Sequence, residues 1–504
     1  MALPRVNVNV DEQTLVTANN VIPFVPAVLL KTKSGPIGTI ETITSEAQFK
    51  AIFGESDYTT PSAYALQVYL RSYAYVLVTR LANESAAAKG TGTIKFKPEE
   101  GADIDLIKID TKYKTDLFNG KEVKIVYDGT SNKIWLDVSA ITGKKTISIK
   151  EDFTADTAKA PDLSAALDKL VASINAADLG IELTNKFINK IVADDVPSVA
   201  QYTAGFSTFI AGGDSGNDTD LDTSKVKELI DKYDLPEKNI DIMTIPEYTN
   251  YEVVNYAVEL AHKNNFMVIT SPTANTVAAE ITAVSNYSQD NRGSLAVYFP
   301  NVYYNDFVNN DGEPQEIPAC IAVLHTYART DIQKKWGAPA GVTRGNLSLV
   351  SGLSVLLSKE DLAALYDNVI PVNGINDISG KGFIVWGNKT TCSTSKFFDR
   401  INVARLVKYV TKKAYDISWD YLFEPITQYV FTDWTSSIET LLENVRLDYG
   451  IEDYQVIMDS TINTEQTVAA NQLNGIIKIK PQEVAEFINI DLTITDTITV
   501  SVAG

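Results

Sequence analysis

The stretch GKGFIVWGNKTTCSTSKFFDRINVARLVKYVTKKAYDISWDYLFEP, from Gly380 to Pro425, combines a short apolar run with a long amphipathic segment. Residues Phe383–Trp386 are apolar and bounded by glycines, a pattern that predicts a short strand buried on both faces. Asp399 is a candidate N-cap for the helix that follows. Beyond it, apolar residues return at roughly helical spacing, at Ile401, Ala404, Leu406, Val407, Val410 and Ala414. The stretch therefore predicts a strand, a loop and an amphipathic helix.

The polar side of this expected helix is strongly basic. Arg405, Lys408 and Lys412 lie at i, i+3 and i+7, which places them on one face, and Lys413 follows directly. Residues 396–413 contain six Lys or Arg and one Asp, a local charge of +5 on a chain of net charge −20. A solvated face with i, i+4 ion pairs is the ordinary explanation, but few acidic residues stand at those spacings. We therefore expect a negative partner to face the helix.

Length and composition indicate a folded chain of several domains. At 504 residues, with 45% hydrophobic and 21% charged residues, about three globular domains are expected. The acidic net charge argues against non-specific nucleic-acid binding and against docking to anionic membranes. No apolar run approaches the roughly 20 residues that span a bilayer, and the first residues lack a signal-peptide core, so we expect a cytoplasmic chain. The two cysteines, Cys320 and Cys392, do not form a disulfide framework or a zinc-finger spacing.

The middle of the chain separates into three parts by its patterning. Residues 22–90 and 208–375 alternate expected helices and strands, which favours a mostly parallel, doubly wound α/β sheet. Residues 91–207, between them, contain short strands separated by Gly, Asn and Asp turns, which predicts an inserted β-rich domain. Residues 376–487 are expected to form a C-terminal α+β core. No GxGxxG follows an expected strand, so a dinucleotide site is not indicated.

The two ends, residues 1–21 and 488–504, are expected to be extended strand arms. Apolar and polar residues alternate at both ends, and one face carries Val6, Val8, Val10, Ile490, Leu492, Ile494, Ile498 and Val500. No hairpin turn gives the first strand a local partner. Each arm either pairs within its own subunit or adds to the sheet of a neighbour, where backbone hydrogen bonds supply the affinity. Periodicity alone leaves both options open.

Two candidate ligand sites have simpler structural explanations. The acidic loop Asp214–Asp222 suggests calcium, but Thr223 stands where an EF-hand needs Gly and Leu229 where it needs a bidentate Glu. A solvated acidic linker is therefore favoured over a metal site. Trp336 and Trp386 could form a ligand-stacking box, but their apolar neighbours favour core packing.

Candidate catalytic residues are few. His325 and Cys392 can be drawn as a pair, but neither a nucleophile elbow nor a papain-like context surrounds the cysteine. The ARTD segment is better explained by structure: we expect Arg329 and Asp331 to take part in an ion pair at a turn, with the guanidinium bonding carbonyls or a carboxylate. The sequence therefore predicts no enzyme.

Several motifs carry a family resemblance. They are WGNKT (Trp386–Thr390), INVARL (Ile401–Leu406), FEP (Phe423–Pro425), ARTD (Ala328–Asp331) and a W-x-A-P segment that begins at Trp336. Together they resemble the contractile tail sheath proteins of myovirus tails and phage-tail-like bacteriocins. The resemblance covers the chain well from about Pro300 onward and weakly over Ile22–Arg80, whereas the inserted domain matches only in its position.

The resemblance implies a structural and mechanical role without catalysis or cofactors. A sheath subunit polymerises as stacked hexameric rings around a tail tube, joined by terminal strands that add to neighbouring sheets, and contracts to drive the tube through an envelope. The basic helix would face the tube through Arg405, Lys408, Lys412 and Lys413. Further partners would be baseplate and tail terminator proteins, with no direct nucleic-acid or membrane contact. Such a subunit would assemble in the bacterial host cytoplasm and then reside in the virion or particle tail.

Two other classes of function compete with this interpretation. One is a cytoplasmic α/β hydrolase-type enzyme with an acidic metal loop, and the other is an adhesin that uses the inserted β-rich domain. An isolated enzyme or adhesin should remain discrete in solution, whereas a sheath protein should form tubular polymers.

Overall fold

The structure is a computed structural model that describes residues 24–98, 102–142, 151–155, 160–187, 196–217, 220–235, 239–289, 292–305, 313–393, 395 and 397–486. Within these residues the chain is a mixed α/β, multidomain protein with five sheets, which confirms the expected fold class at that level. None of the helices in these ranges is long and apolar enough to cross a membrane.

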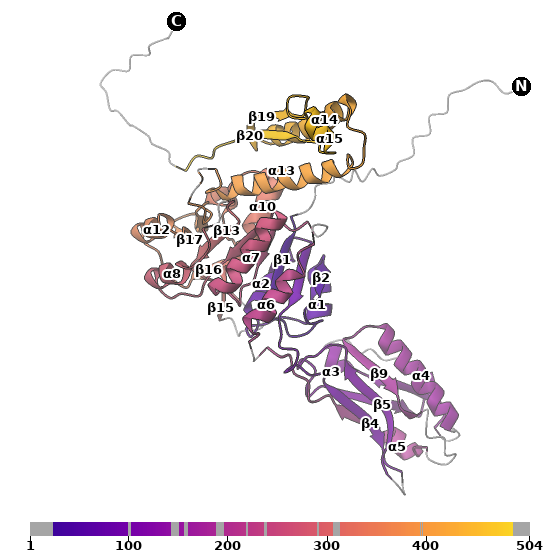
Figure 1. Ribbon diagram of the computed structural model, residues 1–504. Coiled ribbons are helices and arrows are strands. Elements are labelled where there is room, and N and C mark those ends of the chain that lie inside the picture. Colours follow the sequence, from indigo (N-terminus) through magenta and orange to yellow (C-terminus); the bar gives the residue numbers. More distant parts are fainter. Residues whose placement is uncertain are drawn as a thin grey trace, which may run out of the picture.

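The largest sheet has eight strands in the order β18-β17-β13-β12-β11-β1-β3-β2 (Figure 1). Its central strands, from β17 to β3, are parallel, and antiparallel β18 and β2 flank them. The strands are β1 (Pro26–Leu30), β2 (Ile40–Ile43), β3 (Val76–Arg80), β11 (Ile242–Thr244), β12 (Met267–Thr270), β13 (Leu295–Phe299), β17 (Val372–Ile378) and β18 (Gly382–Trp386).

Helices cover both faces of this sheet because the side chains of its central strands are apolar on both faces. In β1, Val28 and Leu30 point into one core cluster, whereas Ala27 and Leu29 point into another, and all four are fully buried. The first face packs against α1 (Glu46–Phe53), α2 (Pro61–Tyr69), α9 (Ala319–Ala322) and α10 (Leu324–Lys334). The second packs against α6 (Thr223–Asp231), α7 (Tyr251–Asn264), α8 (Val277–Val284) and α12 (Lys359–Tyr366).

The inserted segment forms two further sheets around a core of its own. One has the order β10-β6-β7-β8 and the other β4-β5-β9. On α4, Leu163, Leu167, Leu170 and Ile174 recur every three or four residues and are buried in this core. The elements are β4 (Thr91–Phe96), β5 (Ile104–Thr111), β6 (Glu122–Asp128), β7 (Lys133–Asp137), α3 (Ser139–Thr142), β8 (Glu151–Asp152), α4 (Ala160–Ala176), β9 (Ile181–Asn185), α5 (Val199–Ala204) and β10 (Phe206–Phe209). An additional strand expected at 145–149 lies outside the described residues.

A small third region lies beside the main sheet and leads to the long helix. It is a three-stranded antiparallel sheet of β14 (Val302–Asn305), β15 (Pro314–Ile317) and β16 (Val350–Leu353), with the short helix α11 (Gly341–Arg344) before β16. After β18 the chain continues into α13 (Ile401–Trp419).

The C-terminal layer lies on the other side of α13 from the main sheet (Figure 1). It consists of α14 (Gln428–Leu447), the hairpin β19 (Ile451–Ile457) and β20 (Ile476–Pro481), and α15 (Glu465–Ala469). Its core includes Trp434, Ile438 and Leu442 of α14, which are spaced by four residues and buried.

The strand expected at Phe383–Trp386 is present as β18, and its adjacent residues Ile384 and Val385, which point to opposite faces, are both fully buried, as predicted. It is the edge strand of the main sheet, and Trp386 is 49% exposed, so core packing of Trp386 was a wrong prediction. Because β18 pairs with β17, the expected domain boundary at residue 376 falls inside a strand of the main sheet. A short apolar run is compatible with a central or an edge strand, and the sequence pattern could not separate the two.

Candidate functional site

Helix α13 joins two cores. Ile401 and Ala404, in its first turn, are buried against the main sheet, whereas Leu406 and Val410 are buried against α14 in the C-terminal layer. The helix begins one residue later than expected. Its N-cap is Arg400 rather than Asp399, and no side chain caps the first turn; the Asp399 carboxylate instead accepts a hydrogen bond from Arg400 at 2.8 Å.

The four basic residues predicted on this helix make contacts within the chain. Arg405 forms an ion pair with Asp331 of α10 at 2.5 Å, and the two side chains are only 9% and 13% exposed. Lys408 is buried and donates to the Ser294 hydroxyl at 2.8 Å. The ammonium of Lys412 donates to the Ile240 carbonyl, and Lys413 pairs with Asp416 at 3.1 Å. Two of these four partners are carboxylates, so negative groups of the chain itself face part of the stripe.

The missed partners come from elements distant in the sequence. Asp331 precedes Arg405 by 74 residues, and Asp241, which stands just before β11, also acts on the charge of Arg405. Searching along the helix at i±3 and i±4 could not find them, because that spacing reports only contacts within one helix. The ARTD segment carried part of this information, because an ion pair was predicted for Asp331. The pair forms with Arg405 rather than with Arg329.

Arg329 itself lies in α10 and not at a turn. Its guanidinium donates to the carbonyls of Arg344 and Asn346, at 3.2 and 2.6 Å. The expected bonding to carbonyls is therefore present, in a helix.

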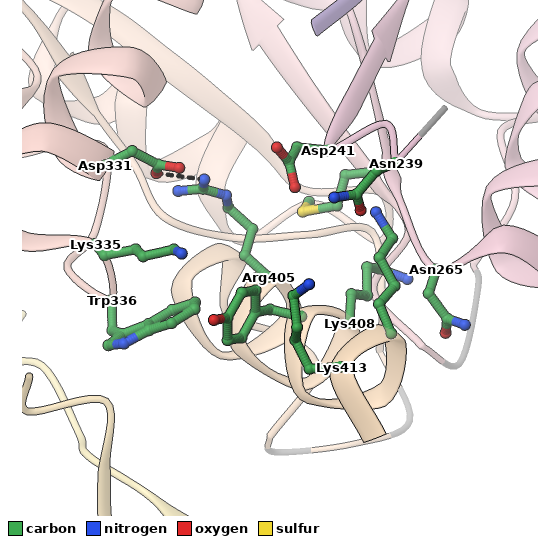
Figure 2. Close-up of a pocket in the computed structure, with 12 residues that line it drawn as sticks. Asn239, Asp241, Asn265, Asp331, Lys335, Trp336, Arg405, Lys408 and Lys413 are labelled. Carbon is green, nitrogen blue, oxygen red and sulfur yellow. Dashed lines mark hydrogen bonds and ion pairs between the residues drawn. The ribbon is translucent and has the colours of Figure 1, made fainter. Parts of the chain in front are cut away.

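A cavity of about 30 Å³ opens beneath α13, where its basic side faces the amino-terminal ends of β11 and β12 (Figure 2). Figure 2 shows Arg405 reaching between Asp331 and the cavity, with Lys335 and Trp336 on one side and Asn239 and Asp241 on the other. The full lining is Asn239, Asp241, Asn265, Met267, Asp331, Lys335, Trp336, Arg405, Lys408, Tyr409, Lys412 and Lys413.

Burial sets the electrostatics of this cavity. It lowers the pKa values of Lys335 and Lys412 below their ordinary range, because a buried ammonium loses its hydration. The carboxylates of Asp331 and Asp241 near Lys335, and of Asp241 and Asp416 near Lys412, offset only part of that effect. Burial also raises the pKa of Asp331, and the positive charge of Arg405 only partly counteracts it. The charged forms of the lysines in this cavity are therefore destabilised by the loss of their hydration.

The β19–β20 hairpin has the properties of a strand acceptor. It is an antiparallel pair, and within the described residues no third strand adds to either outer edge. Tyr454, Val456, Ile477 and Ile479 are partly buried and pack against the α14 core, so that one face is covered while both edges are open. A two-stranded sheet is only marginally stable by itself, and an unpaired edge is a template for another strand.

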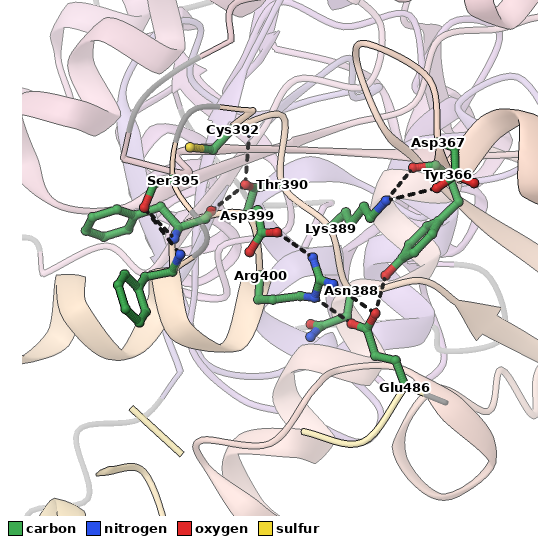
Figure 3. A network of polar contacts seen from close by, with 12 residues as sticks. Tyr366, Asp367, Asn388, Lys389, Thr390, Cys392, Ser395, Asp399, Arg400 and Glu486 are labelled. Carbon is green, nitrogen blue, oxygen red and sulfur yellow. Dashed lines mark hydrogen bonds and ion pairs between the residues drawn. The ribbon is translucent and has the colours of Figure 1, made fainter. Parts of the chain in front are cut away.

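The chain beyond this hairpin is fixed at Glu486, where the described residues end (Figure 3). Its two carboxylate oxygens lie 2.7 Å from Nε and 3.1 Å from Nη2 of Arg400, and the Tyr366 hydroxyl donates to it at 3.2 Å. The predicted strand residues Val6, Val8, Val10, Ile490, Leu492, Ile494, Ile498 and Val500 all lie outside the described residues.

The candidate catalytic residues and Trp336 make contacts of the kind found in a protein core. His325 is buried, and its ring contacts the rings of Tyr69 and Tyr73. Cys392 is also buried, and its backbone NH donates to the Thr390 hydroxyl. Trp336 is buried in the core of the C-terminal layer, as expected.

The acidic loop is partly described, and its carboxylates have separate partners. Asp214 accepts from the Gly216 backbone at 2.7 Å, Asp220 pairs with Lys31 at 2.7 Å, and Asp222 accepts from Ser224 at 2.6 Å. Within the ranges that the structure describes, no group of three or more His, Cys, Asp or Glu side chains is arranged to hold a metal ion.

The fold of the chain resembles solved structures of sheath proteins. The sheath tail protein DSY3957 of Desulfitobacterium hafniense superimposes with a TM-score of 0.57 at 12% identity, over 95% of this chain and 100% of that one. A chain of the anti-feeding prophage helical sheath in the contracted state gives 0.53 at 16% identity, over 98% and 99%. At these identities the likeness is one of fold.

Part of the chain is also similar in sequence to tail sheath proteins of phages. The tail sheath protein of Vibrio phage KVP40 is 31% identical over 182 residues, which are 36% of this chain and 27% of the phage protein. The tail sheath protein of Enterobacteria phage T4 is 28% identical over 221 residues, 43% of this chain and 33% of its own length. No family model matches the chain. The matched segments thus span about a third or less of these relatives, and they confirm the resemblance to phage tail sheath proteins.

Proposed function

We propose that this chain is a structural and mechanical subunit of a contractile tail sheath. It polymerises as stacked hexameric rings around a tail tube and contracts to drive the tube through the envelope of a target cell. Its sequence relatives and the sheath fold over nearly the whole chain support this role. The work comes from repacking of subunits, and no catalysis or cofactor takes part.

The single observation that carries the proposal is the β19–β20 hairpin with its two open edges. Strand arms with one apolar face fit such an acceptor, because backbone hydrogen bonds join the edges while alternate side chains set the register. The apolar face of an added strand would continue the surface that Ile477 and Ile479 turn toward α14. Residues 1–21 and 488–504 are the arms that we assign to the hairpins of neighbouring subunits.

The rest of the chain divides into bodies that keep their shape while these tethers hold. We assign 22–90 with 208–375 to a doubly wound sheath core, 376–487 to a C-terminal core near the tube, and 91–207 to an outward-facing insertion. Strand β18 belongs structurally with the first of these, as part of its sheet. Exchanged strands remain bonded during sliding, since each is held by many backbone hydrogen bonds, whereas surface ion pairs of about 0–1 kcal/mol release readily.

Only part of the basic set predicted on α13 is placed to contact the tube. Arg405 and Lys408 are buried against the main sheet and hold the helix in place. Of the two remaining predicted contacts, Lys412 bonds a carbonyl of the core, whereas Lys413 pairs with Asp416, which is 59% exposed. We therefore propose Lys413 as the member of the set that contributes to a tube contact. Charge reversal at Lys408 would test folding rather than tube binding.

The same role implies further partners and a location. Baseplate and tail terminator proteins would bound the polymer at its two ends, and the subunit would reside in the tail of a virion or related particle after assembly in the bacterial host cytoplasm.

Electron microscopy of the purified chain over a concentration series tests this function. A sheath subunit should form tubular polymers with a hexameric end view. A chain that stays monomeric at high concentration and in the presence of its tube would exclude the proposal.

A further inference from the structure

Arg405, which lines the cavity beneath α13, carries a buried donor without an acceptor in the described part of the chain. Arg405 donates to Asp331 through Nη2, but its Nη1 is buried and has no hydrogen-bond partner among the residues that the structure describes. The side chain is nine-tenths buried and lines the cavity. A buried charged donor left unsatisfied costs more than a neutral one, so an occupant that accepts from it would be stabilising.

The charge of the lining selects the sign of that occupant. Lys335, Arg405, Lys408, Lys412 and Lys413 face two carboxylates, Asp241 and Asp331, so the formal charge of the lining is +3. The amides of Asn239 and Asn265 add neutral donors. In a partly dehydrated site such an excess attracts an anion more strongly than it would in water, because the effective dielectric constant is lower. Lys335 also lies over the rings of Tyr409 and Trp336, at 4.1 and 5.1 Å, which keeps its ammonium beside the cavity.

The size of the cavity limits the class of anion. About 30 Å³ is room for two to three waters, since a single water needs about 10–15 Å³ by the same measure. A halide fits that space, whereas a nucleotide or a peptide side chain with its backbone does not. The position, at the amino-terminal ends of β11 and β12, is also opposite to the carboxyl ends where open α/β sheets usually hold their substrates.

We propose that this cavity is a binding site for a small inorganic anion of the chloride class, held by the guanidinium of Arg405 and the ammonium groups of Lys335 and Lys412. The bound ion joins three elements, since Arg405 and Lys412 come from α13, Lys335 follows α10, and Asn239, whose amide can donate to an anion, precedes β11. It fastens the long helix, and with it the C-terminal layer, to the main sheet. The site does not depend on the proposed sheath function.

The test compares thermal unfolding of the full chain in chloride and in gluconate at equal ionic strength. A ligand that binds only the folded state stabilises it by an amount that grows with the logarithm of its concentration above Kd. We expect the unfolding temperature to rise with chloride in the wild-type chain and in the control Lys334→Met, whose lysine is exposed and lies outside the lining. In Lys412→Met the half-saturating chloride concentration should rise at least tenfold.

Line broadening of ³⁵Cl in NMR spectra supplies a second readout that does not require unfolding. Wild-type chain should broaden the signal and bromide should reverse the effect by competition, which also decides the matter if Lys412→Met does not fold. Equal chloride dependence of the wild type and Lys412→Met, or the absence of any competable broadening, would overturn the proposal.

Discussion

Glu280 shows how strongly single residues are constrained in the main domain. It lies on α8 with no exposed surface, and neither carboxylate oxygen has a hydrogen-bond partner within the described part of the chain. Burial raises its pKa from 4.5 to about 8, because the charged form loses hydration without gaining a partner. Glu280 is therefore protonated in the folded chain at neutral pH.

This arrangement predicts a stability that falls as pH rises. The unfolded state releases the Glu280 proton near pH 4.5 and the folded state near pH 8, so the contribution is complete below pH 4.5 and is lost progressively up to about pH 8. In Glu280→Gln the loss should be absent, so the variant should gain on the wild type by a few kcal/mol between pH 5 and pH 8. Thermal unfolding at several pH values measures the difference, with the exposed Glu228→Gln as control. A difference between Glu280→Gln and wild type that does not change with pH would refute this assignment.

Residues also mark the limit of what the sequence could predict at the site. The positions and the shared face of Arg405, Lys408 and Lys412 followed from helical spacing, but their environment did not. Their partners Asp331, Ser294 and Ile240 belong to other elements, and only the folding of the sheet brings these groups under α13. A charged stripe with no partners along its own helix therefore indicates either an external partner or a distant internal one, and here the internal one is present.

Among the secondary-structure elements, alternation and apolar runs predicted most strands. Whether each strand is central or at an edge depends on its neighbours in the sheet. The near-continuous apolar runs at β1, β12 and β13 became central parallel strands, as such runs should. The similar run at β18 became the last strand of the sheet, because within the described residues its outer edge bonds only the segment 345–347, through an isolated bridge between Asn346 and Ile384. Whether an apolar run is central depends on what pairs with its second edge, and that information is not local.

The root of the C-terminal arm gives a prediction at this scale. Arg400 and Tyr366 fix Glu486, two residues before the arm, so less conformational entropy is lost when the arm pairs with a neighbour. We expect Glu486→Gln to raise the concentration needed for polymerisation about three- to tenfold, which corresponds to roughly 1 kcal/mol. Sedimentation of polymers over a concentration series measures it, and Glu483→Gln, at a nearby exposed position, is the matched control. If both variants polymerise like the wild type, the anchor has no role in assembly.

At the scale of the whole molecule, one side chain connects the main sheet to the inserted domain. Arg80 ends β3 and is fully buried; its guanidinium donates to the carbonyl of Gly35 at 2.7 Å, of Lys114 at 2.9 Å and of Ser215 at 2.7 Å. These carbonyls belong to the main domain, the insertion and the returning segment. Burial lowers the pKa of Arg80 to about 10, so the residue remains charged at neutral pH.

Removing this clamp should loosen the insertion. Arg80→Met leaves three carbonyls without their charged donor, and hydrogen bonds to charged groups contribute about 1.5–3 kcal/mol each. We expect limited proteolysis to cut near residues 81–90 and 211–217, which join the insertion to the main domain, at least tenfold faster than in the wild type. The control variant Arg71→Met, which changes an exposed arginine, should be cleaved at the wild-type rate. Unchanged cleavage in Arg80→Met would show that other contacts fix the insertion.

In the proposed sheath, terminal strands join the subunits, and the alternation of the C-terminal arm can be tested without changing its composition. Exchanging neighbours, with Ile494→Thr plus Thr495→Ile and Ile498→Thr plus Thr499→Ile, moves apolar side chains to the opposite face of the strand while length and content are preserved. Electron microscopy of this variant beside the wild type and a deletion of residues 489–504 is the most direct measurement. We predict tubes from the wild type and soluble, folded subunits from both variants. Normal tubes from the deletion variant would contradict strand exchange by this arm.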